Sequence, residues 1–399
     1  MKKILISSFD MEVGGVERSL VSMLDNFDYD NYDVDLMLYS HSGEFLDLIS
    51  KNVNLLEENK KYKTFRMSIG QTIKSFNIDI GIGRILARFK SKGNGTIQMQ
   101  YMWKYTLPLL PKYKKKYDVA ISYLWPHYFV ADKVDAKVKI PWIHTDYSVI
   151  DTDIDLDLDM WNKFDYIAAV SKDCRKSFLN KYPSLEEKVI VIENITSPNF
   201  VKKLSEEKVD DFDIDENIFK VVSVGRYCEA KGFDNAIKAL KILKDRGYKN
   251  IKWFVVGYGS DEEMLKKLIK ENNLEEDFIL LGKKTNPYPY MKQCDIYAQP
   301  SRYEGKAVTV SEAQILGKCV MLTNYNTAHS QVSDGVDGYI TDLSIEGIAD
   351  GIEKLYKDDI LRKKLEYNCE NNDFSNIEEL EKIYKIIDNH INMEKSNGL

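Results

Sequence analysis

The fold of this chain is decided by the stretch FKVVSVGRYCEAKGFDNAIKALKILKD, residues 219–245. Residues 219–224 are mostly apolar, as in a buried strand, and residues 233–245 repeat apolar side chains with helical spacing. A glycine-containing loop lies between them. A strand, a glycine loop and a helix in this order predict a β-α unit, which builds parallel sheets.

The same alternation extends outward in both directions. Toward the C-terminus we predict strands at 251–256, 278–281, 296–299, 320–323 and 339–341 and helices at 261–272, 309–316 and 377–391. Toward the N-terminus we predict strands at 3–8, 32–38, 53–56, 118–122, 138–144, 166–170 and 189–192. The pattern predicts an α/β protein with two doubly wound sheets, whose ligands bind at the carboxyl ends of the strands.

The chain of 399 residues is long enough for two or three domains. Residues 201–217 are polar, acid-rich and weakly periodic, so they separate the two series of strands. We predict an N-terminal Rossmann-like domain over 1–198, a linker over 199–217 and a C-terminal Rossmann-like domain over 218–375. A final helix over 376–399 could pack back on the first domain.

Composition limits the class of protein. With 44% hydrophobic and 30% charged residues the chain falls in the globular range, which excludes general disorder. The five cysteines form no Cys-x-x-Cys pair, which argues against a disulfide framework or a thiolate zinc site. The apolar run from Ile4 ends before Ser7, and no apolar run is long enough to span a membrane. We therefore expect a cytoplasmic protein without a cleaved leader.

The formal net charge of −7 is unevenly distributed. Between Lys60 and Lys116 the sequence holds fourteen Lys and Arg residues but one acid, Asp79, and apolar residues are interleaved with the cations. Such a segment can bind an anionic membrane surface. We expect it to hold the protein at the inner face of the membrane, and we expect no nucleic acid partner. The alternative is that the apolar residues pack on the first sheet while the lysines only face water.

The loop after the strand at 219–224 carries residues suited to a diphosphate. Gly225-Arg226 follows the strand directly, and Lys231-Gly232 immediately precedes the helix. Two cations beside a helix N-terminus favour binding of a diphosphate.

The loop after the strand at 296–299 supplies two carboxylates. Glu304 lies in this loop, and Glu312 lies about two turns along the following helix. Carboxylates in these places could reach opposite ends of one ligand.

In combination these features resemble glycosyltransferase family 4, a retaining group of the glycosyl transferases group 1. That resemblance implies the GT-B fold, in which two Rossmann-like domains face each other across a cleft. It covers nearly the whole chain. It rests on GGVE at 14–17, IH at 143–144, VIEN at 191–194, GR and KG at 225–226 and 231–232, VGYG at 256–259, and the segment 301–312 with its two glutamates.

The resemblance also implies roles for single residues. Arg226 and Lys231 would bind the diphosphate of the donor, and Glu312 would bond the ribose hydroxyls. Glu304 would lie against the transferred sugar, and His144 on the acceptor side. The other residues implied at the donor are Gly14, Gly15, Gly225, Gly257, Gly305, Lys306, Ala307 and Val308.

Residues 305–308 depart from the family pattern. The family usually has Gly-Phe-Gly-Leu where this chain has Gly-Lys-Ala-Val. Lys306 adds a cation beside the sugar site, which could contact a phosphate or an acidic sugar, or point to solvent. The departure bears on the identity of the donor more than on the reaction.

Two further patterns suggest cofactors that we do not expect. The alternating aspartates of 151–159 look like the Asp-x-Asp metal sites of other glycosyltransferases. Hard cations need convergent carboxylates, and family 4 needs no metal, so we predict an acidic loop or an exposed strand edge there. Gly257 and Gly259 begin a dinucleotide fingerprint, but Glu262 occupies the place of its third glycine. We expect no metal and no cofactor besides the nucleotide-sugar co-substrate.

The sequence thus predicts a retaining, metal-independent hexosyltransferase with a nucleotide-sugar donor, for which UDP is the expected nucleotide. A carbohydrate or glycolipid acceptor in bacterial surface polysaccharide or glycoconjugate assembly is the preferred substrate. Two alternatives stay open: a transferase or synthase for a small soluble acceptor, and a non-catalytic sugar-nucleotide-binding subunit of a transferase pair. The intact residues Arg226, Lys231, Glu304 and Glu312 argue against the second alternative.

Overall fold

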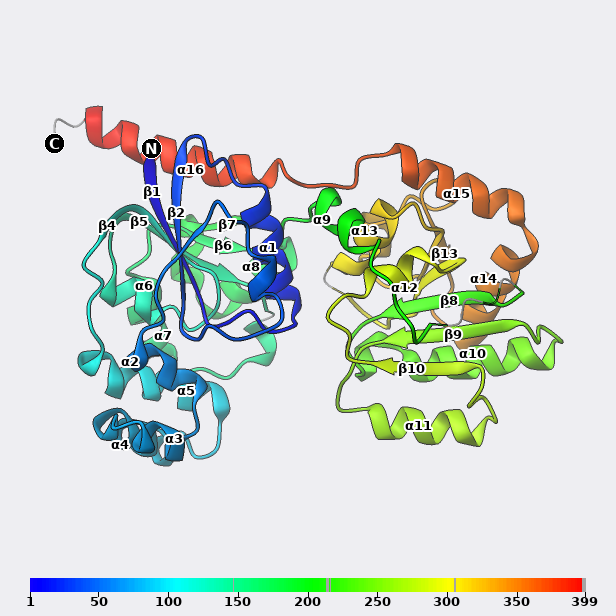
Figure 1. Ribbon diagram of the computed structural model, residues 1–399, viewed down its shortest axis with the longest axis horizontal. Coiled ribbons are helices and arrows are strands. Elements are labelled where there is room, and N and C mark those ends of the chain that lie inside the picture. The colour runs from blue at the N-terminus through cyan, green and yellow to red at the C-terminus, as the bar shows by residue number, and fades with distance from the viewer. Residues whose placement is uncertain (146, 213–214, 216, 305, 397–399) are drawn as a thin grey trace. The chain divides into compact units, whose positions relative to one another are not determined.

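The computed structural model describes residues 1–145, 147–212, 215, 217–304 and 306–396 (Figure 1). The chain divides into two compact units. Unit 1 comprises Met1–Ile195 and the C-terminal segment from Asn376, and unit 2 comprises Thr196–Ser375. Each unit has its own sheet of parallel strands joined by helices, so the predicted α/β class is confirmed.

The sheet of unit 1 has the strand order β3-β2-β1-β4-β5-β6-β7. In its centre, Ile4 of β1 pairs with Val34 of β2 and Val119 of β4, all in parallel register. β1 is buried from Ile4 onward, which suits its nearly continuous apolar sequence. The strands are β1 Lys2–Ser8, β2 Tyr32–Leu38, β3 Asn54–Leu55, β4 Lys116–Ser122, β5 Asp135–Ile143, β6 Ile167–Ala169 and β7 Val189–Val191.

The helices of unit 1 connect these strands. The α-helices are α1 Gly15–Asp25, α2 Lys60–Lys63, α3 Ile69–Lys74, α4 Ile78–Lys90, α5 Gly95–Thr106, α6 Tyr128–Lys133, α7 Ile154–Trp161, α8 Lys172–Lys181 and α16 Glu379–Ser396. Short 3-10 turns are η1 Leu46–Leu48, η2 Thr64–Arg66, η3 Leu107–Leu109, η4 Tyr147–Val149 and η5 Pro183–Lys188.

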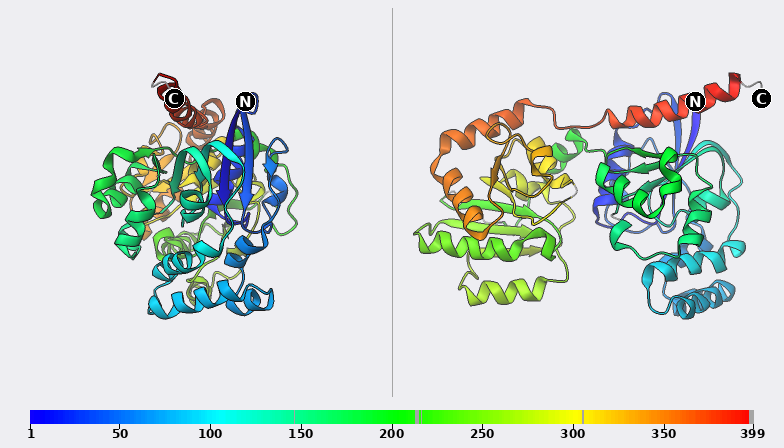
Figure 2. Two further views of the ribbon diagram at one scale, coloured as in Figure 1. Left: turned by 90° about the vertical axis from the view of Figure 1, so that its left-hand side faces the viewer. Right: turned by 180° about the vertical axis from the view of Figure 1, so that it is seen from behind.

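The C-terminal helix α16 belongs to unit 1, along which it lies (Figures 1 and 2). Ile383 and Ile387 of this helix are buried. The ring of Tyr384 stacks on Tyr32 of β2, with 4.9 Å between the ring centroids. The Asp28 backbone N–H donates to the Tyr384 hydroxyl over 2.9 Å. Apolar burial and aromatic stacking therefore hold the end of the chain against its beginning.

The sheet of unit 2 has the order β10-β9-β8-β11-β12-β13, again all parallel. Its strands are β8 Phe219–Val224, β9 Ile251–Val256, β10 Phe278–Gly282, β11 Ile296–Gln299, β12 Val320–Thr323 and β13 Tyr339–Thr341. Its helices are α9 Pro198–Leu204, α10 Phe233–Asp245, α11 Glu262–Glu271, α12 Tyr288–Lys292, α13 Val308–Ile315, α14 Ile345–Lys357 and α15 Asp359–Asn371, with 3-10 turns η6 Glu229–Lys231 and η7 Ala328–Ser330.

The structure differs from the linker expected over 199–217. Helix α9 occupies the start of that range and packs against α12 and α13 of unit 2. Its Phe200, Val201 and Leu204 are buried. The chain passes from unit 1 to unit 2 between Ile195 and Thr196. This short helix is held by tertiary burial, which the weak local periodicity did not reveal.

Both sheets reverse their strand order beside a central strand. The reversal lies between β1 and β4 in unit 1 and between β8 and β11 in unit 2. In doubly wound sheets, ligands bind outside the carboxyl ends of the strands at such points. The loops that follow β8 and β11 contain the residues singled out above for donor binding.

Candidate functional site

Two glycines shape the loop after β8. Gly232 has a φ of +67° at the start of α10, and a Cβ there would lie 2.1 Å from the Pro300 carbonyl oxygen. A Cβ on Gly225 would lie 3.2 Å from Cδ of Lys231. Glycine therefore allows close backbone contact with the loop after β11 and lets the stem of Lys231 lie across the end of β8.

Lys231 meets Glu304 at this edge of the sheet. Its Nζ donates to Glu304 Oε1 over 2.6 Å, and the two side chains are 19% and 12% exposed. The same carboxylate oxygen accepts from Ser301 Oγ at 2.5 Å and from Gln299 Nε2 at 3.0 Å. Three donors on one oxygen, one of them charged, fix the carboxylate in place.

Gln299 and Ser301 were not singled out from the sequence, although they position Glu304. Gln299 is 1% exposed, and its amide oxygen accepts from the Tyr297 hydroxyl over 2.8 Å. That bond orients the amide so that its nitrogen faces Glu304. The available signal was the pair of polar residues at the end of the apolar strand β11, shortly before Glu304.

Glu312 lies on α13 and is 1% exposed. Its Oε1 accepts from the Tyr288 hydroxyl over 2.7 Å. Tyr288 begins α12, so two helices fix this carboxylate. Both glutamates thus belong to the chain that follows β11, where Tyr288 bonds to Glu312 and Lys231 bonds to Glu304.

The loop after β9 packs on the loop after β8. A Cβ on Gly257 would lie 1.9 Å from the Gly225 carbonyl oxygen, and one on Gly259 would lie 2.2 Å from that of Tyr227. The two glycines are needed for this backbone contact, which identifies the apparent dinucleotide fingerprint as a packing feature.

The Arg226 side chain is exposed on the loop after β8.

Gln331 holds the turn before α13. The Ala307 N–H donates to Gln331 Oε1 over 3.1 Å, and Gln331 Nε2 donates back to the Ala307 carbonyl over 3.0 Å. Val308 is the first residue of α13, and Lys306 is exposed. Gly305 lies outside the residues that the structure describes.

In unit 1, the glycine loop follows β1. Gly14 caps α1, and a Cβ there would lie 2.2 Å from Oε2 of Glu17, whereas a Cβ on Gly15 would meet nothing within 4 Å. Burial raises the pKa of the Glu17 carboxyl, and the charge of Asp10 adds to that effect. Neither glycine is sterically required here, because the Glu17 carboxylate is the far end of a flexible side chain and Gly14 has an extended backbone.

His144 follows β5 and lies close to Asn194. Its Nε2 is 2.8 Å from the Tyr123 carbonyl oxygen, and this nitrogen carries the ring proton because a carbonyl can only accept. Burial lowers the pKa of His144 to about 4, against smaller opposing contacts with Tyr123 and Asn194. The imidazole is therefore neutral near pH 7. Two segments that carry the family resemblance, IH and VIEN, meet at this point.

Residues 154–159 of the aspartate-rich stretch 151–159 lie in helix α7, not in the loop or strand edge that we expected. Asp153 caps α7 by accepting the Leu156 N–H over 3.3 Å. Asp157 is buried and accepts from Gln100 Nε2 at 2.9 Å and from the Tyr182 hydroxyl at 2.6 Å. Carboxylates in a first helical turn are favourable next to the helix dipole. Across the described ranges, no group of three or more His, Cys, Asp or Glu could hold a metal ion.

The basic segment of unit 1 carries exposed apolar residues. Helices α3, α4 and α5 pack side by side at one end of unit 1 (Figures 1 and 2). Phe76 and Phe89 are 92% and 80% exposed, whereas Ile80 is buried. The alternative that the apolar residues of this segment pack on the first sheet is therefore wrong for Phe76 and Phe89. Over the part of the chain that the structure describes, we find no helix with the length and apolar character needed to cross a membrane.

Comparisons with known proteins find a family model that matches most of unit 2. Residues 205–372 match the family model described as glycosyl transferases group 1. An uncharacterized glycosyltransferase of Methanocaldococcus jannaschii is 33% identical over 222 residues, which are 53% of this chain and 54% of that protein. The N-acetylgalactosamine-N,N'-diacetylbacillosaminyl-diphospho-undecaprenol 4-alpha-N-acetylgalactosaminyltransferase of Campylobacter jejuni is 27% identical over 206 residues, 51% of this chain and 54% of that protein. The chain spans about half the length of these curated relatives.

Solved structures resemble the chain over almost its full length. Anabaena Alr3699/HepE in complex with UDP-glucose has a TM-score of 0.64 at 17% identity and covers 98% of this chain and 100% of its own. Staphylococcus aureus TarM has a TM-score of 0.64 at 15% identity, with 97% and 99% covered. These likenesses confirm the predicted GT-B class of fold. Within a chain of that fold, residues 205–372 match the family model of the glycosyl transferases group 1.

Proposed function

We propose that the protein is a retaining glycosyltransferase that transfers a hexose-type sugar from a uridine diphosphate donor to an acceptor hydroxyl. The observation that carries this proposal is the Lys231–Glu304 pair, which lies at the carboxyl edge of the unit 2 sheet. It combines a cation suited to a diphosphate with a fixed carboxylate suited to a sugar. A solved structure with the same fold, HepE, holds UDP-glucose, which supports the choice of donor.

The charges of the site match those of the reaction. As the bond between the anomeric carbon and the diphosphate oxygen breaks, positive charge grows on the sugar and negative charge on the diphosphate. Arg226 and Lys231 would stabilise the departing diphosphate, and Glu304 would stabilise the sugar. The acceptor oxygen would attack from the same face, and its proton would pass to the departing phosphate. Glu312 would hold the ribose hydroxyls.

The neutral state of His144 restricts its role. With a pKa of about 4 the ring does not supply a positive charge near pH 7. We propose that it contacts the acceptor side of the sugar as a hydrogen-bonding group. We also propose that the reaction needs no metal, because two side-chain cations and the start of α10 would answer the charge of the diphosphate.

The acceptor that we propose is a carbohydrate or glycolipid in bacterial surface polysaccharide or glycoconjugate assembly. The Campylobacter jejuni relative is named for an acceptor carried on diphospho-undecaprenol, which supports a lipid-borne substrate. We further propose that residues 60–116 bring unit 1 to the anionic inner face of a membrane.

Turnover with a panel of nucleotide sugars tests the function. Nucleotide diphosphate release is followed with and without acceptors, and the anomeric configuration of the product is read by NMR. We expect UDP release with a UDP-hexose and retention of configuration. Inversion would refute the retaining mechanism. Tight donor binding without turnover on any acceptor would instead indicate a non-catalytic binding subunit.

A further inference from the structure

Helix α4 turns its small residues and Ile80 inward and most of its large apolar residues outward. A Cβ on Gly81 would lie 2.7 Å from Ile73 of α3, and one on Gly83 would lie 3.0 Å from Thr106 of α5, so α4 packs closely on both helices. On the outer side lies the apolar stripe, which we define as Ile78, Ile82, Leu86 and Phe89, exposed by 54%, 53%, 52% and 80%. The spacing of these four residues places them along one face of the helix.

Exposed apolar side chains of unit 1 are concentrated at this place. Among its described residues, the large hydrophobic side chains that are exposed all lie between Ile73 and Phe89, apart from Met1 and Ile154. Single exposed hydrophobic residues are normal on a protein surface, but a contiguous patch marks a surface that binds something apolar.

Phe76 connects α3 to α4 and extends this patch. Its φ is +61°, in the left-handed region that glycine or asparagine normally occupies after a helix. Its ring is nevertheless 92% exposed. A bulky aromatic residue is unfavourable here both for its backbone and for its hydration, and a contact with something outside the chain would account for it.

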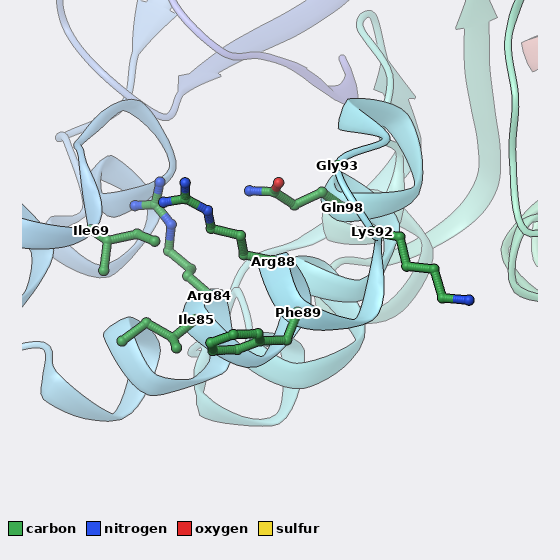
Figure 3. A pocket seen from close by; sticks show the side chains of 8 residues that line it. All are labelled: Ile69, Arg84, Ile85, Arg88, Phe89, Lys92, Gly93 and Gln98. Carbon is green, nitrogen blue, oxygen red and sulfur yellow. The ribbon is translucent and has the colours of Figure 1, made fainter.

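A pocket with two arginines lies beside the stripe. This arginine pocket, of about 960 Å³, is lined by Arg84, Ile85, Arg88, Phe89 and Gln98 together with neighbouring residues. Figure 3 shows the two guanidinium groups and the Gln98 amide directed to the same side of the pocket, with Ile85 and Phe89 at its apolar wall.

The arginines of this pocket lack an acidic partner among the described residues. Arg84 Nη1 donates to the Thr64 carbonyl at 2.7 Å and to Thr72 Oγ1 at 2.9 Å, both neutral groups. The one acid of the basic segment, Asp79, lies 4.0 Å from Lys61 instead. Two like charges one helical turn apart repel each other, and an anion between them would relieve that repulsion.

We propose that the α3–α4 hairpin inserts Phe76 and the apolar stripe into the interface of an anionic bilayer, where the arginine pocket binds the phosphate of a lipid headgroup. A lipid satisfies both features, because its phosphate meets the guanidiniums while its chains meet Phe89 and the stripe. Inorganic phosphate would leave the stripe in water. The inference rests on the membrane contact proposed above for unit 1 and is independent of the sugar chemistry of unit 2.

Sedimentation of the full chain with vesicles tests this inference. The vesicles contain phosphatidylcholine alone or mixed with phosphatidylglycerol. The apolar variant combines Phe76→Asn, which suits the left-handed backbone, with Phe89→Ser. The charge variant is Arg88→Gln. Matched controls remove an exposed apolar residue, Ile154→Ser, and a cation of the basic segment outside the hairpin, Lys112→Gln.

The two variants should fail in different ways. Loss of both phenyl rings should weaken binding to either vesicle by about tenfold or more. Arg88→Gln should weaken binding by about fivefold on phosphatidylglycerol vesicles at low salt, with little change on phosphatidylcholine alone. Each control should stay within about twofold of the parent, because a single solvated cation or an isolated apolar residue contributes little. Turnover with a soluble acceptor should be unchanged in all variants.

Three results would overturn the inference. Equal binding by the hairpin variants and the parent would place the membrane contact elsewhere in residues 60–116. Negligible pelleting of the parent would remove the membrane contact itself, while turnover would still report on the sugar transfer. Binding of inorganic phosphate that Arg88→Gln abolishes, with vesicle binding unchanged, would assign the pocket to a free anion.

Discussion

Substitution of Lys231 by alanine tests the centre of the proposed site. The variant removes the cation that donates to Glu304 over 2.6 Å and that would face the departing diphosphate. The lysine side chain is only 19% exposed, so water screens its charge incompletely. Removal of one charged group that stabilises a transition state raises the activation free energy by about 3–4 kcal/mol, which corresponds to a fall in kcat of about 100- to 1000-fold.

The same variant should remain folded. Glu304 keeps its bonds from Ser301 and Gln299, so the carboxylate stays partnered. We expect a loss of about 1–2 kcal/mol in the free energy of unfolding, as for removal of one hydrogen-bond partner. Lys238→Ala is the matched control, because Lys238 is an exposed lysine on α10 of the same unit.

The assay measures initial rates of UDP release with donor and acceptor at saturation, together with thermal unfolding of each variant. Lys231→Ala should lose turnover while Lys238→Ala keeps it. If Lys231→Ala is folded and its kcat stays within about threefold of the parent, the lysine does not act on the leaving group and the assignment is wrong.

Three further outcomes are expected. Glu312→Ala should raise the KM for the donor by about tenfold or more and change kcat less, because a charged hydrogen bond to the ribose contributes about 1.5–3 kcal/mol; an unchanged KM would contradict that role. EDTA should leave the initial rate intact, whereas loss of activity that Mg²⁺ or Mn²⁺ restores would require a metal site. Because burial lowers the pKa of His144 from 6.5 to about 4, the unfolded state binds more protons between these values, so stability should fall as the pH is lowered through that range. Urea unfolding at several pH values measures this effect. Over that pH range the free energy of unfolding should fall by about 2–3 kcal/mol less in His144→Gln than in the parent. Equal pH dependence of the two proteins would refute the buried neutral state.

Much of unit 2 could be predicted from local sequence. β8 occupies Phe219–Val224, as its apolar run predicts, and α10 begins directly after Gly232. Local propensity and the tertiary fold agree in this region, so the pattern was sufficient. The aspartates of 151–159 show the opposite case, because their helix depends on the buried partners Gln100 and Tyr182, which lie far away in the sequence.

The sequence by itself determined the α/β class, the family resemblance and the types of residue that we propose for a diphosphate site, because these depend on spacing within single β-α units. Only the tertiary structure decided which residues meet. Lys231 and Glu304 lie on different β-α units, and the parallel pairing of β8 with β11 brings them together. The structure also decided which face of α4 is exposed. The periodicity of the helix gives it an apolar face, but the packing of Gly81 and Gly83 on α3 and α5 turns that face toward solvent. Periodicity is local, whereas the choice of the buried face depends on neighbours that only the fold supplies.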